Sequence, residues 1–466
     1  MRYKIALNSP TVYAVMSTLT KTASYAIVIP VAYTKLPSPE FALWQIFVSI
    51  NILIQLLDFG LSPTFIRVLS YTRGDGDLER NQVQILEQQM NIAKIMGFTG
   101  CLLGILLGAL LLQELIGATQ SPSISSICLF LYCISSLVQF MSNTMGASLQ
   151  GLGHIMPFKK WEAVISFGQF CTLALAVFYA NSLITIVLAQ QIWVVISFVK
   201  YRSIALRLEP ELFLHRATEW WLFVKPDVNF SNLIWKPVFK TGIAIILSQG
   251  FVQLSSVILA SKLSAESLAV YLLVLRISTF INMLSQIPFN VYIPVFAKLY
   301  AQGKFIELYR TLKVKINYSM QFYIGISVLI IKIVYFKLVH HEIVLTLYDN
   351  RIILSVFIAA FFAERIGAYT IQIQSLSNNI KMHLVNGASF IGMLICFHYI
   401  SSQNLMLAFP LAALLSNVLI YIPFCVYLWR VQFKDIVPFQ TLLRIFSGTF
   451  ITVCLIGVLS VIWRCT

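Results

Sequence analysis

Charged side chains inside long apolar stretches are the residues of this chain best suited to chemistry. A charge near the middle of a bilayer costs at least roughly 2.5 to 3.5 kcal/mol on insertion scales, so each needs a partner, water or a ligand. We predict that one central cavity binds substrate through the charged residues and three polar neighbours: Lys21, Asp58, Arg276, Glu364, Arg365, Gln55, Asn282 and Tyr369. A purely structural ion pair between Lys21 and Asp58 is the open alternative.

Polar residues also recur at helical spacing on these stretches. Steps of four, three and four residues place Asn51, Gln55, Asp58 and Ser62 on one helix face. Similar stripes occur at Ser17, Lys21 and Ser24, at Ser135, Gln139 and Ser142, at Gln249, Gln253 and Ser256, at Arg276, Thr279, Asn282 and Gln286, and at Arg365, Tyr369 and Gln372. We expect the stripes to line a hydrated cavity. For any single Ser or Gln, hydrogen bonding between helices is the alternative.

Prolines mark the places where these helices should bend. Proline removes one helical hydrogen bond and kinks the helix where it stands. We predict hinge or kink positions at Pro30, Gly60, Pro63 and Pro288. Because Gly60 lies one turn before Pro63, the inner part of the second helix should bend.

Motifs for enzymatic or metal chemistry are missing from the sequence. It contains no GxxxxGK[ST], HExxH or GxSxG pattern, and its eight cysteines fall almost entirely in apolar runs. The histidines cluster only at His340 and His341, beside Glu342, where we expect a solvated outer loop. We therefore predict no catalytic residues, no metal and no cofactor. Transport must then use an ion gradient, the membrane potential or the substrate's own gradient, and coupling to protons or another cation stays open.

The composition indicates that the bilayer is the solvent of these elements. Of 466 residues, 58% are hydrophobic and 11% are charged, against about 25% charged in soluble chains. Apolar runs of membrane-spanning length predict an all-α polytopic membrane protein. The thirteen predicted helices span 11–33, 41–66, 92–116, 124–148, 161–181, 183–200, 238–261, 266–290, 316–336, 352–375, 382–400, 405–429 and 445–463.

The basic residues give the orientation. Most of the 33 Lys and Arg residues fall in alternate loops, which predicts a cytoplasmic N-terminus in a bacterial inner membrane. The net charge of +15 is then explained by anionic headgroups, so membrane lipids are expected partners and nucleic acid is not.

An internal repeat divides the chain. The string 35–42, KLPSPEFA, resembles 262–269, KLSAESLA, and 63–67, PTFIR, resembles 294–298, PVFAK. We predict two six-helix lobes, 1–206 and 236–430, related by a pseudo-two-fold axis along the membrane normal. A cytoplasmic linker, 207–235, joins the lobes. An amphipathic segment and one extra C-terminal helix follow at 431–466.

Two motifs in the first two helices resemble the polysaccharide-biosynthesis flippases. They are Pro37-Ser-Pro-Glu-Phe-Ala-Leu-Trp44 and Asp58-Phe-Gly-Leu-Ser-Pro-Thr-Phe-Ile-Arg67, with a weaker echo in Gln150-Gly-Leu-Gly153 and Lys160-Trp-Glu162. These are the O-antigen and repeat-unit translocases of the multidrug/oligosaccharidyl-lipid/polysaccharide exporter superfamily. Ala42 departs from the pattern, because the family often has glycine there.

The resemblance implies a flippase that moves an undecaprenyl-diphosphate-linked oligosaccharide to the outer leaflet by alternating access. Lys21, Arg276 and Arg365 would then face the diphosphate, while Asp58 and Glu364 would take up protons or pair with those cations. We also expect a monomer that associates with polysaccharide polymerase machinery. A multidrug or cation antiporter of the same superfamily is the alternative, although the predicted midplane is slightly basic. A glycan polymerase or ligase is a further alternative, but its usual large outer loop is missing here.

Overall fold

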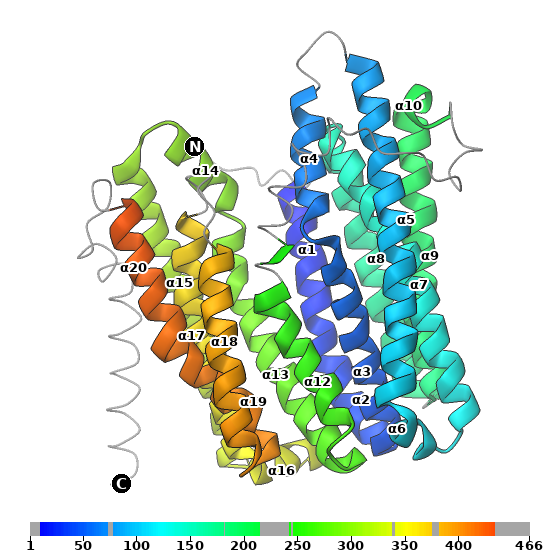
Figure 1. Ribbon diagram of the computed structural model, residues 1–466, viewed down its shortest axis with the longest axis vertical. Coiled ribbons are helices and arrows are strands. Elements are labelled where there is room, and N and C mark those ends of the chain that lie inside the picture. The colour runs from blue at the N-terminus through cyan, green and yellow to red at the C-terminus, as the bar shows by residue number, and fades with distance from the viewer. Residues whose placement is uncertain are drawn as a thin grey trace. The chain divides into compact units, whose positions relative to one another are not determined.

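The computed structural model describes residues 10–72, 78–180, 182–214, 242–243, 246–337, 341–374 and 382–433. Every regular element in these ranges is helical, which confirms the all-α class (Figure 1). Eleven helical segments of the described chain are long and apolar enough to cross a membrane, and the chain is a multi-pass membrane protein. Of the other two predicted spans, 445–463 lies outside the described residues and 238–261 is only partly described.

The chain forms two compact units, Met1–Leu272 and Leu273–Thr466, and each is described by itself. The division falls inside helix α13 (Ala265–Asn290). The domain boundaries given above stay predictions, and most of the linker 207–235 lies outside the described residues.

The first unit contains the first six predicted spans. The first span is α1 (Pro10–Ala23), a π-helical turn (Ser24–Val28) and α2 (Ile29–Lys35), with Pro30 as the second residue of α2. The other elements are α3 (Ser38–Gln55), α4 (Leu61–Thr72), α5 (Leu78–Leu111), α6 (Gln113–Gly117), α7 (Pro122–Gly151), α8 (Ile155–Leu175), α9 (Leu183–Leu208), α10 (Pro210–Leu214) and α12 (Phe251–Ala260).

Helix α7 is central to this unit, where it packs against α5, α9 and α4, while α1 packs against α8 (Figure 1). Buried apolar residues of α4, α5, α7 and α9 form one core, which includes Phe65, Leu69 and Met145. A polar contact also joins three helices of this unit: Gln190 Oε1 of α9 accepts hydrogen bonds from Trp44 Nε1 of α3, at 3.0 Å, and from the Tyr132 hydroxyl of α7.

The second span is interrupted between α3 and α4. A single 3₁₀ turn (Leu56–Asp58) leads into Phe59 at φ 49° and Gly60 at φ 74°, both left-handed. Helical geometry is thus interrupted at Phe59 and Gly60, close to the position where the sequence predicts a bend. Pro63 stands in the first turn of α4, where its missing N–H would have no partner in the helix anyway, so it does not kink the helix.

A close backbone approach accompanies this interruption. A Cβ atom added at Gly242 would lie 2.5 Å from Phe59 Cβ and 2.7 Å from Phe59 Cα. Any residue larger than glycine at position 242 would therefore push against Phe59, and one of the two backbones would have to move. The hinge roles of Pro30, Gly60, Pro63 and Pro288 remain predictions.

The local structure repeats along the chain as the sequence strings indicated. Helix α13 begins at Ala265, 227 positions after the start of α3 at Ser38. It too is followed by a short helix, α14 (Ile293–Ala301), with Pro294 in the first turn just as Pro63 lies in α4. Pro288 lies inside α13, two residues before its end. Both repeats thus contain a long helix, an interruption and a proline-led short helix.

The second unit continues with further helices. They are α15 (Phe305–Tyr335), α16 (Glu342–Asp349), α17 (Arg351–Gln374), α18 (Met382–Ser401), α19 (Leu405–Ser416), a π-helical turn (Asn417–Tyr421) and α20 (Ile422–Phe433). Helix α16 replaces part of the predicted outer loop. There His341 Nδ1 accepts a hydrogen bond from Ile343 N at 3.3 Å, so this histidine caps a helix, and His340 lies outside the described residues.

Candidate functional site

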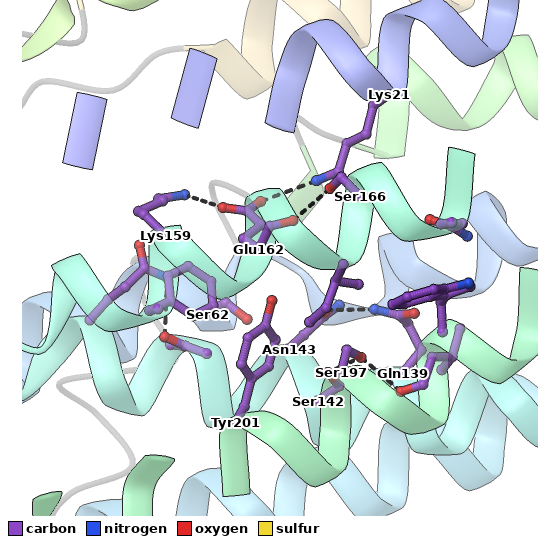
Figure 2. Close-up of a pocket in the computed structure, with 18 of the residues that line it drawn as sticks. Lys21, Ser62, Gln139, Ser142, Asn143, Lys159, Glu162, Ser166, Ser197 and Tyr201 are labelled. Carbon is purple, nitrogen blue, oxygen red and sulfur yellow. Dashed lines mark hydrogen bonds and ion pairs between the residues drawn. The ribbon is translucent and has the colours of Figure 1, made fainter. Parts of the chain in front are cut away.

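A polar cavity of about 420 Å³ lies within the first unit. Helices α1, α4, α7, α8 and α9 supply its walls together with the 3₁₀ turn before α4 (Figure 2). Its charged lining residues are Lys21, Asp58, Lys159 and Glu162. Its volume falls in the range of about 300 to 1,000 Å³ that is usual for small-ligand sites. Two of the eight predicted site residues, Lys21 and Asp58, therefore share a cavity.

One carboxylate joins two lysines in this cavity. Glu162 Oε1 lies 3.1 Å from Lys21 Nζ of α1, and Glu162 Oε2 lies 2.8 Å from Lys159 Nζ. The side chain of Lys21 is 53% exposed, against 21% for Glu162 and 25% for Lys159. We call these three residues the lysine–glutamate triad. In the part of the chain that the structure describes, Lys21 pairs with Glu162, whereas no ion pair joins it to Asp58.

The Asp58 carboxylate has a structural partner of its own. It accepts hydrogen bonds from Ser62 N at 3.2 Å and from Ser62 Oγ at 3.1 Å. A carboxylate at the start of a helix satisfies free N–H groups and is stabilised by the helix dipole. Asp58 therefore starts α4 after the break, while it also lines the cavity.

Uncharged polar residues line the rest of the cavity. Asn143 Nδ2 donates to Gln55 Oε1 at 2.9 Å, and Gln139 Nε2 donates to Asn143 Oδ1 at 2.8 Å. The hydroxyls of Ser142 and Ser197 lie 2.7 Å apart across α7 and α9. The third predicted residue of this unit, Gln55, is thus hydrogen-bonded to the cavity wall.

The other five predicted residues lie in the second unit. Arg365 Nη2 lies 2.5 Å from Glu364 Oε1, its neighbour in α17. The Tyr369 hydroxyl lies 2.5 Å from Ser319 Oγ, which donates to the carbonyl of Ser285. Arg276 and Asn282 are buried in α13. A single cavity that contains all eight residues remains a prediction.

No protein-family model matches this chain, and no curated protein matches it. Solved structures do match across most of its length. The lipid II flippase MurJ in an inward closed conformation superposes with a TM-score of 0.64 at 13% identity and covers 96% of this chain and 92% of its own. An inward-facing multidrug resistance MATE family transporter of the MOP superfamily gives a TM-score of 0.61 at 13% identity, over 89% and 96% of the two chains.

The chain has the MOP superfamily fold. A third match is a MOP superfamily transporter from Pyrococcus furiosus, whose description reports a binding pocket of reverse polarity. It gives a TM-score of 0.52 at 12% identity and covers 91% of this chain and 98% of its own.

The central acid of the cavity, Glu162, is not among the residues that the sequence predicts for the site. The predicted helix begins at residue 161, which puts Glu162 at the membrane edge. Helix α8 begins at Ile155, so Glu162 lies two turns inside it. With Lys159 it also changes the charge balance, since two lysines now face two acids, Asp58 and Glu162. Within the first-unit cavity the charges therefore balance, and the slightly basic midplane counted over both lobes remains a prediction.

Proposed function

We propose that this protein is a flippase for an undecaprenyl-diphosphate-linked oligosaccharide. It would carry the lipid from the inner to the outer leaflet of a bacterial inner membrane by alternating access, with its N-terminus in the cytoplasm. One observation carries the proposal: a polar cavity inside a membrane-spanning unit contains two lysines that share one carboxylate. The MOP fold, shared with a lipid II flippase, supports it.

The lysine–glutamate triad suits a diphosphate for electrostatic reasons. In the empty cavity Glu162 compensates Lys21 and Lys159, so neither ammonium is left alone at membrane depth. Phosphate oxygens accept the same charge-assisted hydrogen bonds as a carboxylate. A diphosphate that enters the cavity can therefore replace Glu162 as the partner of both lysines.

A reconstituted transport assay tests this function. Full-length protein in proteoliposomes would be given undecaprenyl diphosphate linked to fluorescent N-acetylglucosamine, and an impermeant quencher would report the fluorophore that reaches the outer leaflet. We expect Lys159→Ala to slow transfer roughly 10- to 100-fold, because one hydrogen bond to a charged group contributes about 1.5 to 3 kcal/mol.

Lys160→Ala is the matched control, since Lys160 is the exposed neighbour of Lys159 and does not line the cavity. Equal transfer rates in the two variants would remove the triad from the mechanism. No transfer by the wild-type protein above empty liposomes would refute the flippase itself.

A cation antiporter is the second candidate, and the two cavity carboxylates favour it. Asp58 and Glu162 balance the two lysines, so a cationic drug would find an acidic partner. The MATE transporters among the structural matches fit this function equally well. Uptake of ethidium into the same proteoliposomes, driven by a pH gradient and lost in Glu162→Gln, would favour the antiporter over the flippase.

A further inference from the structure

The cavity has one wall without charges, opposite the lysine–glutamate triad (Figure 2). Helix α9 contributes Trp193, Ser197 and Tyr201, and α7 contributes Gln139 and Ser142. The three α9 residues follow each other at steps of four, so they lie on one helix face. A diphosphate needs only hydrogen-bond donors, whereas the amide and hydroxyl groups of this wall also accept hydrogen bonds.

Two polar groups of the cavity lack partners. Neither the Tyr201 hydroxyl nor the Gln169 side-chain amide has a hydrogen bond within the part of the chain that the structure describes, although both residues line the cavity. Tyr201 is only 7% exposed, and its ring packs on Phe158 at 5.0 Å between centroids. Its hydroxyl points into the cavity (Figure 2). The ring is thus held in place while its hydroxyl faces the cavity, where it can form a hydrogen bond with a ligand.

The chemistry of this wall selects the class of ligand. Amides and hydroxyls both donate and accept hydrogen bonds, whereas an anion needs donors and a cation needs acceptors. Aromatic rings such as Trp193 add an apolar face beside polar groups. A pyranose ring has this same mixture, with hydroxyls around its edge and C–H bonds on its faces.

We propose that Tyr201, Gln169 and Trp193 bind the sugars nearest the diphosphate. This rests on the proposed function, with the diphosphate on Lys21 and Lys159. Gln169 lies seven positions beyond Glu162 on α8, roughly 10 Å at about 1.5 Å per residue. The sugar attached to the diphosphate would then meet Tyr201 first, and the saccharide would extend towards Gln169 and Trp193.

Lipid binding to the full-length protein in nanodiscs tests the proposal. One probe is bare undecaprenyl diphosphate. The others are undecaprenyl diphosphates that carry one glucose, galactose, mannose, N-acetylglucosamine or N-acetylgalactosamine. We expect at least one sugar to tighten wild-type binding over the bare lipid. Tyr201→Phe keeps the ring but removes one hydrogen bond, so its affinity for the sugar-bearing lipid should fall about tenfold. Its affinity for the bare lipid should equal that of the wild type.

Tyr179→Phe is the matched control, because Tyr179 is 83% exposed and does not line the cavity. It should bind every probe like the wild type. If the bare lipid binds but no sugar tightens binding, or if Tyr201→Phe weakens bare and sugar-bearing lipids equally, the saccharide site is refuted while the diphosphate function stands. If the wild type binds none of the probes, both proposals fail.

Discussion

Glu162→Gln gives the sharpest test of how the cavity treats an anion. The substitution keeps the shape of the side chain but removes the negative charge that Lys21 and Lys159 share. In our proposal Glu162 competes with the diphosphate for those lysines. The variant should therefore bind undecaprenyl diphosphate more tightly than the wild type, even though two ion pairs have been removed.

The size of the effect follows from the geometry of the triad. Both lysine nitrogens lie within 3.1 Å of Glu162, so a phosphate held by them comes close to the carboxylate. Two like charges about 4 Å apart repel by about 4 kcal/mol at an effective dielectric constant of about 20. Lys21 is 53% exposed, so solvent and salt screen much of this. We discount the repulsion to about 1.4 kcal/mol, which is a factor of about ten in Kd.

The assay is equilibrium binding of undecaprenyl diphosphate to nanodiscs at low and physiological salt. Glu162→Gln should bind about tenfold more tightly, and the gain should shrink as salt is added. Glu114→Gln is the control, because Glu114 is exposed in α6 and does not line the cavity. An unchanged or weaker affinity of Glu162→Gln, in a variant with wild-type thermal stability, would refute the competition between carboxylate and diphosphate.

Two further predictions concern the packing that holds the cavity. Gly242→Ala should destabilise the protein by about 1 to 3 kcal/mol, since its Cβ would lie 2.5 Å from a neighbouring side chain, whereas Gly117→Ala, with no atom within 4 Å, should not; thermal unfolding in detergent measures both. Gln190→Leu should cost about 1 to 3 kcal/mol for each donor that it leaves without an acceptor, Trp44 Nε1 among them. Gln190→Glu, which keeps the acceptor oxygen, should unfold closer to the wild type in the same measurement, and equal losses would contradict the role of that oxygen.

The sequence was sufficient for the elements that depend on local pattern. The solvent preference of a helix is a property of its own residues, so apolar runs gave the spans, and the first span at 11–33 matches the helical stretch Pro10–Lys35. The repeat strings likewise predicted that α3 and α13 start at equivalent positions. Helical periodicity placed Gln139 and Ser142 on one face of α7, and both line the cavity. Ser135, from the same stripe, bonds instead to the carbonyl of Tyr132 in its own helix.

The sequence indicated where the second span is interrupted but not which residues create the interruption. Gly60 and Pro63 indicated a bend, but two left-handed residues and the Asp58 cap create it. Phe59 has no intrinsic preference for that conformation. Its backbone is held by the surroundings, including the approach of Gly242, and such contacts have no local signal.

The pairing of charges was decided by tertiary structure alone. Lys21 and Glu162 are 141 residues apart, and nothing in the periodicity of α1 or α8 indicates that they meet. The sequence leaves a pair between Lys21 and Asp58 open, but α1 packs on α8 and Lys21 pairs with Glu162. Periodicity identifies the polar face of one helix, whereas the packing of helices determines which faces meet. The sequence by itself therefore determined a polytopic helical protein with buried charges, and only the fold determined which of them share a cavity.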